Sequence, residues 1–109
     1  MLCSSAGSQI EIDTDTFNSL IENKEVDIID VREPHELPEI NEFSNIKIPL
    51  ALLENNTSLV KSETVIAFCQ TGKRSLLAAR VLSGIFGGKK KVYSLRGGIV
   101  EWKKQNQPV

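Results

Sequence analysis

Four consecutive apolar residues at positions 65–68, Val-Ile-Ala-Phe, constrain the fold of this chain more than any other segment. They do not alternate with polar residues, so a strand here is buried on both faces, which is typical of a central strand in a parallel sheet. Parallel neighbours are joined by long crossover connections, usually helices. The sequence therefore predicts an α/β fold with a mostly parallel central sheet flanked by helices.

Apolar runs and helical stretches alternate along the rest of the chain. We expect about five strands, at residues 8–12, 26–30, 46–49, 65–68 and 91–95. We expect helices at about 15–23, 73–86 and 99–106, and one helical turn within the proline-containing stretch 33–40. Residues 1–8 are small and polar and are expected to form a flexible tail or linker remnant, with the domain at 9–109.

The size and composition fit one globular domain. The chain has 109 residues, of which 40% are hydrophobic and 25% charged. Its longest apolar stretches, 65–69 and 76–79, are far shorter than the ~18 residues of a membrane-spanning helix. The first eight residues carry no secretory signal, and two cysteines do not make a disulfide framework. We therefore expect a cytoplasmic protein that does not bind membranes.

Charge is unevenly distributed along the sequence. Residues 1–64 carry 4 basic and 13 acidic side chains, and residues 65–109 carry 9 basic and 1 acidic side chain. The two halves either neutralise each other in the fold or leave a basic face for an anionic substrate or an acidic protein. The sequence pI of about 5.8 and the lack of aromatics among the basic residues argue against nucleic-acid binding.

The segment with the clearest chemistry follows the central strand. Cys69 ends that strand, and a short loop with one glycine, Gly72, leads directly into the longest helix. The loop amides can surround the sulfur as an anion-binding nest, supported by the helix dipole and by the charges of Lys73 and Arg74. We expect an ionised sulfur that solvent can reach at the edge of the sheet.

Such a loop changes the reactivity of a thiol. At a reference pKa near 8.5, about 3% of a thiol is ionised at pH 7, whereas a pKa of about 6.5 makes roughly three-quarters of it thiolate. Cys69 is then a nucleophile. The alternative is a buried structural cysteine at the end of a strand.

Other known loops and sites built from cysteine, glycine or basic residues fit this sequence less well. A Walker loop requires glycine where Ala67 stands and Ser or Thr where Arg74 stands. A redox pair requires a second cysteine at Gly72, and the cysteine phosphatase signature places Arg six positions after the cysteine, where this chain has Ser75. A single histidine, His35, gives little basis for a cysteine protease or a metal site, so we expect no metal and no cofactor.

Three motifs in order resemble the single-domain rhodaneses: residues 30–36 (DVREPHE), 69–75 (CQTGKRS) and 95–102 (LRGGIVEW). The resemblance covers residues 9–106 and implies a rhodanese-like fold. It also implies a sulfurtransferase in which Cys69 alternates between thiolate and persulfide. Asp30, Arg32 and Trp102 match positions with mainly structural, supporting roles. The implied anion-binding loop consists of Gln70, Thr71, Gly72, Lys73, Arg74 and Ser75.

Residues 39–50 depart from the usual pattern of the family. They are more similar to the rhodanese domain appended to adenylating enzymes of the MoeB and ThiF type, which activate ubiquitin-like sulfur carriers. This similarity implies thiosulfate or a protein persulfide as sulfur donor, and a carrier protein of molybdopterin or thiamin synthesis as acceptor. The alternative is a catalytically silent module that binds an acidic partner through basic residues, namely Lys73, Arg74, Arg80 and 89–91.

Overall fold

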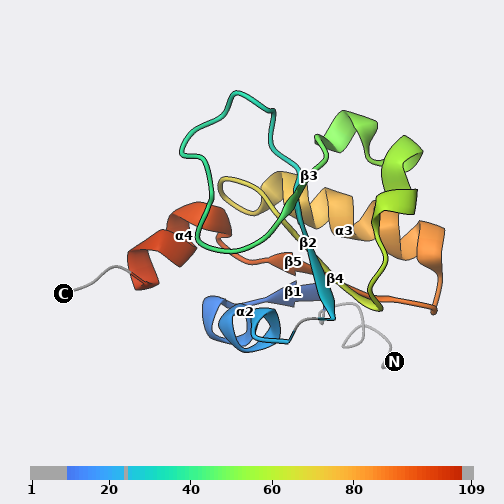
Figure 1. The fold of residues 1–109 in the computed structure, drawn as a ribbon, viewed down its shortest axis with the longest axis horizontal. Helices are drawn as coiled ribbons and strands as arrows, with labels where there is room; N and C mark the ends of the chain where they lie inside the picture. Colours follow the sequence, from blue (N-terminus) through green and yellow to red (C-terminus); the bar gives the residue numbers. More distant parts are fainter. Residues whose placement is uncertain (1–9, 24, 107–109) are drawn as a thin grey trace.

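The computed structural model describes residues 10–23 and 25–106, in which five parallel strands form one sheet (Figure 1). The strand order is β1-β5-β4-β2-β3, so β4 lies at the centre, as its apolar sequence predicts. The strands are β1 (Glu11–Ile12), β2 (Val26–Asp30), β3 (Ile46–Lys47), β4 (Thr64–Phe68) and β5 (Lys91–Leu95). All four neighbouring pairs are parallel.

The central strand divides the core into two layers. Val65 and Ala67 face one side of the sheet, Ile66 and Phe68 face the other, and all four residues are fully buried. Helix α3 (Lys73–Phe86) covers the first side together with the short 3-10 helices η2 (Leu50–Leu52) and η3 (Glu54–Leu59). Helices α2 (Thr14–Ile21) and α4 (Gly98–Gln105) cover the second side (Figure 1).

An aromatic cluster holds α2 and α4 against the sheet. Phe43 contacts Phe17, Phe68 and Trp102 edge to face, with ring centroids 5.2, 5.6 and 5.3 Å apart. The indole nitrogen of Trp102 donates a hydrogen bond to Asn18 Oδ1 at 2.8 Å. Trp102 is 8% exposed, so this residue is part of the core. The cluster fixes the position of α4, whose first turn contacts the loop after β4.

Most of the expected elements are present. The stretches 26–30, 73–86 and 91–95 have the expected bounds, and Asp13 caps α2 by accepting from Thr16 N at 2.9 Å. The first strand, expected at 8–12, is shorter: it covers Glu11–Ile12, and residues 8 and 9 of the expected strand lie outside the described residues, as does the whole of 1–9. The expected tail at 1–8 and the second cysteine, Cys3, also lie there.

The prediction of a helical turn within 33–40 is wrong. This stretch contains turns and bends, and one backbone bond of the turn type joins Glu36 N to Glu33 O at 3.1 Å. Pro34 and Pro38 have no amide hydrogen, so a helix here would lose two donors. The 3-10 helices η2 and η3 were not expected either, because their sequence has no apolar period long enough to indicate a helix. No helix among the described residues has the length and apolarity to span a membrane.

The start of α4 lies directly on the backbone of the loop after β4. Ile99 N donates to Cys69 O at 2.9 Å, and Val100 N donates to Gln70 O at 3.1 Å. Gly98 has a φ of +67°, and a Cβ there would overlap the carbonyl of Gln70 and lie 2.7 Å from Cys69 O. Only glycine therefore permits this close approach.

We predict that Gly98→Ala lowers the free energy of unfolding by about 2 kcal/mol or more, through backbone strain and the displaced loop. The matched control is Gly84→Ala in α3, where a Cβ meets nothing within 4 Å. That variant should gain about 0.5–1 kcal/mol, because alanine is the better helix former. Urea denaturation of the three proteins measures both changes, and equal stability of Gly98→Ala and the unchanged chain would contradict the close contact.

Candidate active site

The sulfur of Cys69 lies at the carboxyl end of β4 and accepts hydrogen bonds from the loop that follows. Gly72 N donates to Sγ at 3.1 Å and Ser75 N donates to it at 3.3 Å. The hydroxyl oxygen of Ser75 is 3.6 Å from the same sulfur. Amides that converge on one atom in this way stabilise negative charge there.

Gly72 makes this loop geometry possible. Its φ is +101°, in the left-handed region, and it caps the start of α3. A Cβ at this position would lie 3.0 Å from Gly97 N, so the site also brings the glycine pair after β5 close to the loop. The single glycine noted in the sequence is thus required by conformation and by space.

Hydrogen bonding determines the ionisation of the thiol. Burial raises the pKa of Cys69, but hydrogen bonds from Ser75, Gly72 and Thr71 lower it by more, so the net pKa lies below the ordinary value. The largest of the lowering contributions comes from the Ser75 side chain. At neutral pH the thiolate is therefore more populated than in a free cysteine.

The sulfur is less accessible than the sequence argument requires. We expected a thiol that solvent can reach, but Cys69 is only 1% exposed. The physical reason is that the loop bends over the sulfur to direct its amides at it, while the first turn of α4 covers the backbone. Chemistry at this sulfur therefore needs neighbouring groups to move aside.

Two buried serines extend the hydrogen bonding behind the sulfur. Ser75 Oγ and Ser94 Oγ are 2.8 Å apart, and both residues are fully buried. Ser75 Oγ also donates to Gly72 O at 3.3 Å, and the protonated thiol donates to Ser75 Oγ. With Ser94 as the donor of the serine pair, the single proton of Ser75 stabilises the thiolate when it turns from Gly72 O to Sγ. The sequence reasoning did not identify Ser94. Its signal is a small polar residue in β5 at the same face as Val92, which is buried against α3.

Arg74 does not contribute an uncompensated charge to the loop, which corrects the expectation from the sequence. Its Nη1 and Nη2 atoms lie 2.5 and 2.8 Å from Glu36 Oε2 and Oε1. The hydrogen bond from Arg74 lowers the pKa of Glu36 to about 2. Glu36 in turn raises the pKa of Arg74. The sequence placed Glu36 in a family motif, but nothing in a one-dimensional pattern indicated that it pairs across 38 positions.

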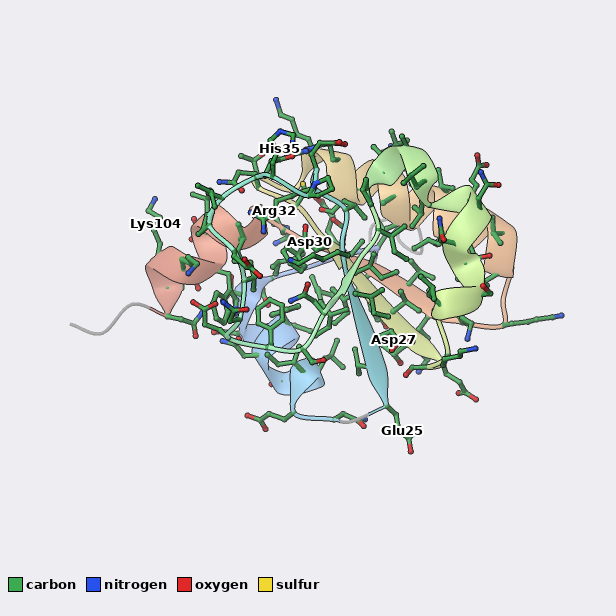
Figure 2. All side chains as sticks on the ribbon, turned by 45° about the horizontal axis from the view of Figure 1, so that its top comes forward. Glu25, Asp27, Asp30, Arg32, His35 and Lys104 are labelled. Carbon is green, nitrogen blue, oxygen red and sulfur yellow. The ribbon has the colours of Figure 1, made fainter. Side chains whose placement is uncertain are left out.

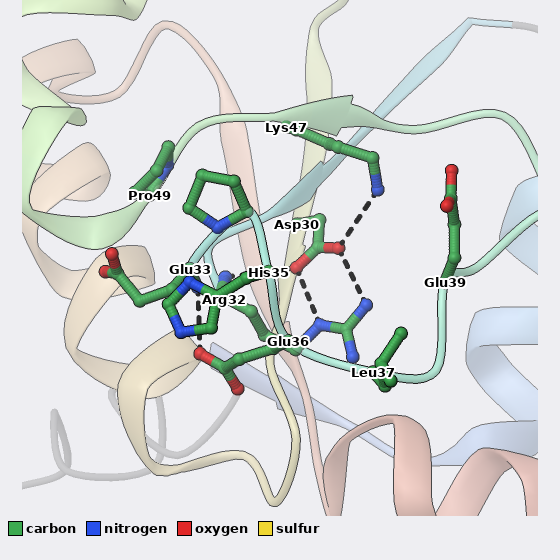
Figure 3. A pocket seen from close by; sticks show the side chains of 10 residues that line it. Asp30, Arg32, Glu33, His35, Glu36, Leu37, Glu39, Lys47 and Pro49 are labelled. Carbon is green, nitrogen blue, oxygen red and sulfur yellow. Dashed lines mark hydrogen bonds and ion pairs between the residues drawn. The ribbon is translucent and has the colours of Figure 1, made fainter.

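Asp30 and Arg32 form a second ion pair beside the loop. Arg32 Nε and Nη2 donate to Asp30 Oδ1 and Oδ2, both at 3.0 Å (Figure 3), and both side chains are buried. Arg32 Nη1 also donates to Gln70 Oε1 at 3.1 Å. This pair therefore links the segment after β2 to the first residue after Cys69.

A pocket of about 250 Å³ lies under the segment after β2 (Figure 3). Glu36 is one of its lining residues, while Cys69 is not. His35 is exposed at the rim (Figure 2). The complete lining is Asp30, Arg32, Glu33, Pro34, His35, Glu36, Leu37, Glu39, Lys47 and Pro49.

The predicted site residues thus separate into three groups. Gly72 and Ser75 contact the sulfur, and the amide of Thr71 acts on its ionisation. Gln70 and Arg74 direct their side chains to the segment after β2. Lys73 is exposed. Among the described residues, no group of three His, Cys, Asp or Glu side chains is arranged to hold a metal ion.

A sequence model described as the rhodanese-like domain matches residues 13–105. The chain belongs to the rhodanese-like domain family. It is 29% identical over 101 residues to a sulfurtransferase of Allochromatium vinosum, covering 91% of this chain and 92% of that protein. The likeness to the rhodanese domain of adenylating enzymes is also found: the chain is 34% identical over 84 residues to the probable adenylyltransferase/sulfurtransferase MoeZ of Mycobacterium tuberculosis. That match covers 74% of this chain and only 21% of MoeZ.

The fold comparison agrees with the family. A rhodanese-related protein from Thermoplasma volcanium superimposes with a TM-score of 0.73 at 27% identity, over 90% of this chain and 94% of that one. The predicted α/β architecture with a mostly parallel sheet is thus confirmed. Membership of the rhodanese-like family supports sulfur transfer as the general class of activity.

We predict that Ser75→Ala raises the pKa of Cys69, because it removes the largest contribution that stabilises the thiolate. At pH 7 the rate of alkylation of Cys69 by iodoacetamide should fall about three- to tenfold. Ser94→Ala should act in the same direction but more weakly. Ser58→Ala, an exposed serine in η3, is the matched control and should leave the pH profile unchanged. Identical profiles for all variants would contradict the role of the hydroxyl.

The Glu36–Arg74 pair predicts a pH dependence of stability. Because the pKa of Glu36 falls from 4.5 to about 2 on folding, its charge stabilises the fold fully above about pH 4.5 and loses this effect as the pH falls towards 2. The difference in unfolding free energy between the unchanged chain and Glu36→Gln should be constant from pH 7 to 5.5. It should shrink below pH 4.5. A difference that does not vary with pH would exclude the ion pair as its source.

Proposed function

We propose that this chain is a sulfurtransferase in which Cys69 carries sulfane sulfur as a persulfide. The observation that carries the proposal is the pair of amides, from Gly72 and Ser75, that donate to Sγ at the carboxyl end of β4. Such donors stabilise a thiolate before the reaction and a terminal persulfide anion after it. The family relationship and the sulfurtransferase of Allochromatium vinosum support the same reaction class.

The chemistry needs one nucleophilic sulfur and a donor with a weak sulfur–sulfur bond. The Cys69 thiolate attacks the sulfane sulfur of the donor, a new S–S bond forms, and the donor's S–S bond breaks with its electron pair leaving on the donor fragment. In the second step an acceptor nucleophile attacks the outer sulfur, and the bonding pair returns to Cys69. The two steps balance without any metal or organic cofactor.

The 1% exposure of Cys69 requires movement during this cycle. The side chains that extend from the loop to the neighbouring segment, Gln70 and Arg74, are both held by partners from the segment after β2. A donor reaches the sulfur when these contacts change, and the outer sulfur of the persulfide then extends from the loop towards the acceptor. The buried cysteine of the alternative hypothesis needs no such access, so reactivity in the native state separates the two.

For the acceptor we propose a ubiquitin-like sulfur carrier of molybdopterin or thiamin synthesis, in the reducing environment of the cytoplasm. The similarity to MoeZ supports this acceptor, although the chain spans about a fifth of that protein. With a carrier whose carboxyl terminus is activated as an acyl adenylate the roles are reversed: the outer persulfide sulfur attacks the carbonyl carbon and the adenylate leaves. A thiol then attacks the Cys69 sulfur of the resulting acyl disulfide, forms a disulfide with Cys69 and releases the carrier thiocarboxylate. The donor is thiosulfate or the persulfide of another protein.

The decisive experiment replaces Cys69 with serine and measures sulfur transfer from thiosulfate to cyanide. We expect complete loss of activity in Cys69→Ser. Intact-protein mass spectrometry after exposure to thiosulfate should show one added sulfur atom on the unchanged chain and none on the variant. Cys3→Ser is the matched control, since it removes the other cysteine, and it should keep both the activity and the added sulfur.

Two outcomes would contradict the proposal. Full activity in Cys69→Ser assigns the reaction to another group. Absence of transfer and of added sulfur in the unchanged chain, together with tight carrier binding that Cys69→Ala leaves unaffected, favours a silent binding module. Hydrolysis of an aryl phosphate by the unchanged chain would indicate phosphatase chemistry instead.

A further inference from the structure

The guanidinium of Arg74 is already bound to an anion that belongs to the protein. Both Glu36 oxygens accept from it, at 2.5 and 2.8 Å, and Glu36 Oε2 also accepts from Glu33 N at 2.8 Å. The Glu36 side chain is 23% exposed. A half-buried carboxylate with three donors is held in one place and keeps the two-nitrogen edge of the guanidinium occupied.

Arg74 is placed beside the sulfur by the loop backbone, because the amide of the next residue, Ser75, donates to Cys69 Sγ at 3.3 Å. The negative charge of the thiolate contributes to raising the pKa of Arg74, after the larger contribution from Glu36. Arg74 is therefore a cation that would bind the anionic end of a sulfur donor at this sulfur. In the structure it is engaged by Glu36 instead.

The other cations beside the site offer little replacement. Arg32 and Lys47 both contact Asp30, at 3.0 and 3.6 Å. Of the cations in the loop and the segment after β2, within residues 10–23 and 25–106, Lys73 is the one without an ion pair. Within these two segments Lys73 is therefore the cation available for an incoming anion; Arg96, which follows β5 at the same end of the sheet, is also exposed.

Glu33 is a second carboxylate whose charge acts on Arg74, while Glu39 lies on the far side of the pocket from Glu36 (Figure 3). Glu33 and Glu39 are exposed and line the same pocket as Glu36 (Figure 3). Negative charge beside Arg74 raises the free energy of an approaching anion, and the effect grows with the charge of the anion. A dianion is therefore disfavoured more than a neutral or singly charged donor.

We propose that Glu36 determines the sulfur donor, by occupying Arg74 and so favouring thiol persulfides over thiosulfate. This inference rests on the proposed function, since it concerns the donor for Cys69. Glu36 is a specificity-determining residue that acts through Arg74 and does not touch the reacting sulfur.

The two donors differ in the charge that the site must accommodate. With thiosulfate, a thiolate and a dianion give the Cys69 persulfide anion and sulfite, which leaves with the bonding pair of the broken S–S bond and carries two negative charges. With a thiol persulfide, R–S–SH, the thiolate attacks the outer sulfur and the S–S bond breaks. The leaving thiolate takes the proton of the outer sulfur and departs as the neutral thiol. In the reaction with a thiol persulfide, the reacting sulfurs together carry one negative charge from start to end.

The test compares the two donors in the unchanged chain and in Glu36→Gln, which keeps the shape of Glu36 and removes its charge. The donors are thiosulfate and cysteine persulfide, and kcat/KM for each is measured with cyanide as acceptor. We expect Glu36→Gln to raise kcat/KM for thiosulfate about tenfold, equivalent to about 1.4 kcal/mol. The value for cysteine persulfide should change by less than about threefold.

Three further variants isolate the mechanism. Glu39→Gln removes a carboxylate from the same pocket that does not contact Arg74, and it should change kcat/KM for either donor little. Glu36→Asp keeps the charge and should keep the low thiosulfate value. In the double variant Glu36→Gln/Arg74→Gln, the gain with thiosulfate should disappear, because the released guanidinium is gone. An unchanged donor ratio in Glu36→Gln, or an equal gain in Glu39→Gln, overturns the inference.

Sulfate binding, measured by calorimetry, needs no sulfur transfer and so separates this inference from the proposed function. Glu36→Gln should bind sulfate about tenfold more tightly than the unchanged chain and Glu39→Gln. If neither donor adds sulfur to Cys69 in any folded variant, the proposed function fails, and the sulfate result still decides whether Glu36 occupies the anion site. Equal sulfate affinity in all three proteins overturns the role of Glu36.

Discussion

The junction between the first turn of α4 and the loop after β4 is the contact on which the site depends. The amides of Ile99 and Val100 take the carbonyls of Cys69 and Gln70 as acceptors, at 2.9 and 3.1 Å. With these carbonyls directed at α4, the following amides of the loop remain to face the sulfur. A helix on one side of the sheet thereby orients a loop that opens into a helix on the other side.

The first turn of α3 shows how the site balances charge. Two cations, Lys73 and Arg74, stand at a helix N-terminus, and the first turn has no acidic residue. Cations are unfavourable at this end, because the helix dipole already places partial positive charge there. Here Glu36 compensates Arg74, and the thiolate of Cys69 supplies negative charge at the same place. A local electrostatic cost is thus tolerated where it serves the sulfur.

The sequence was sufficient for the parts of the molecule that depend on local pattern. The all-apolar run at 65–68 identified the central strand, and Gly72 followed by basic residues identified the loop whose amides meet at Cys69. Contacts between residues far apart in the sequence could not be predicted from the sequence pattern. The Glu36–Arg74 pair spans 38 positions and the Ser75–Ser94 bond spans 19, and no local spacing encodes either. Burial of Cys69 was predicted only as the alternative to an accessible sulfur, and local pattern could not decide between them, because the first turn of α4 that packs on this loop comes from far along the chain.

The position of Trp102 has a consequence for observing the molecule in solution. It is the single tryptophan of the chain, and it packs between Phe17 and Phe43 on the helix that begins at the loop carbonyls. The residue is 8% exposed and its indole nitrogen donates to Asn18, so its fluorescence emission reports on the position of α4 against the sheet. The molecule therefore carries an intrinsic optical probe on the same rigid element that shapes the sulfur site.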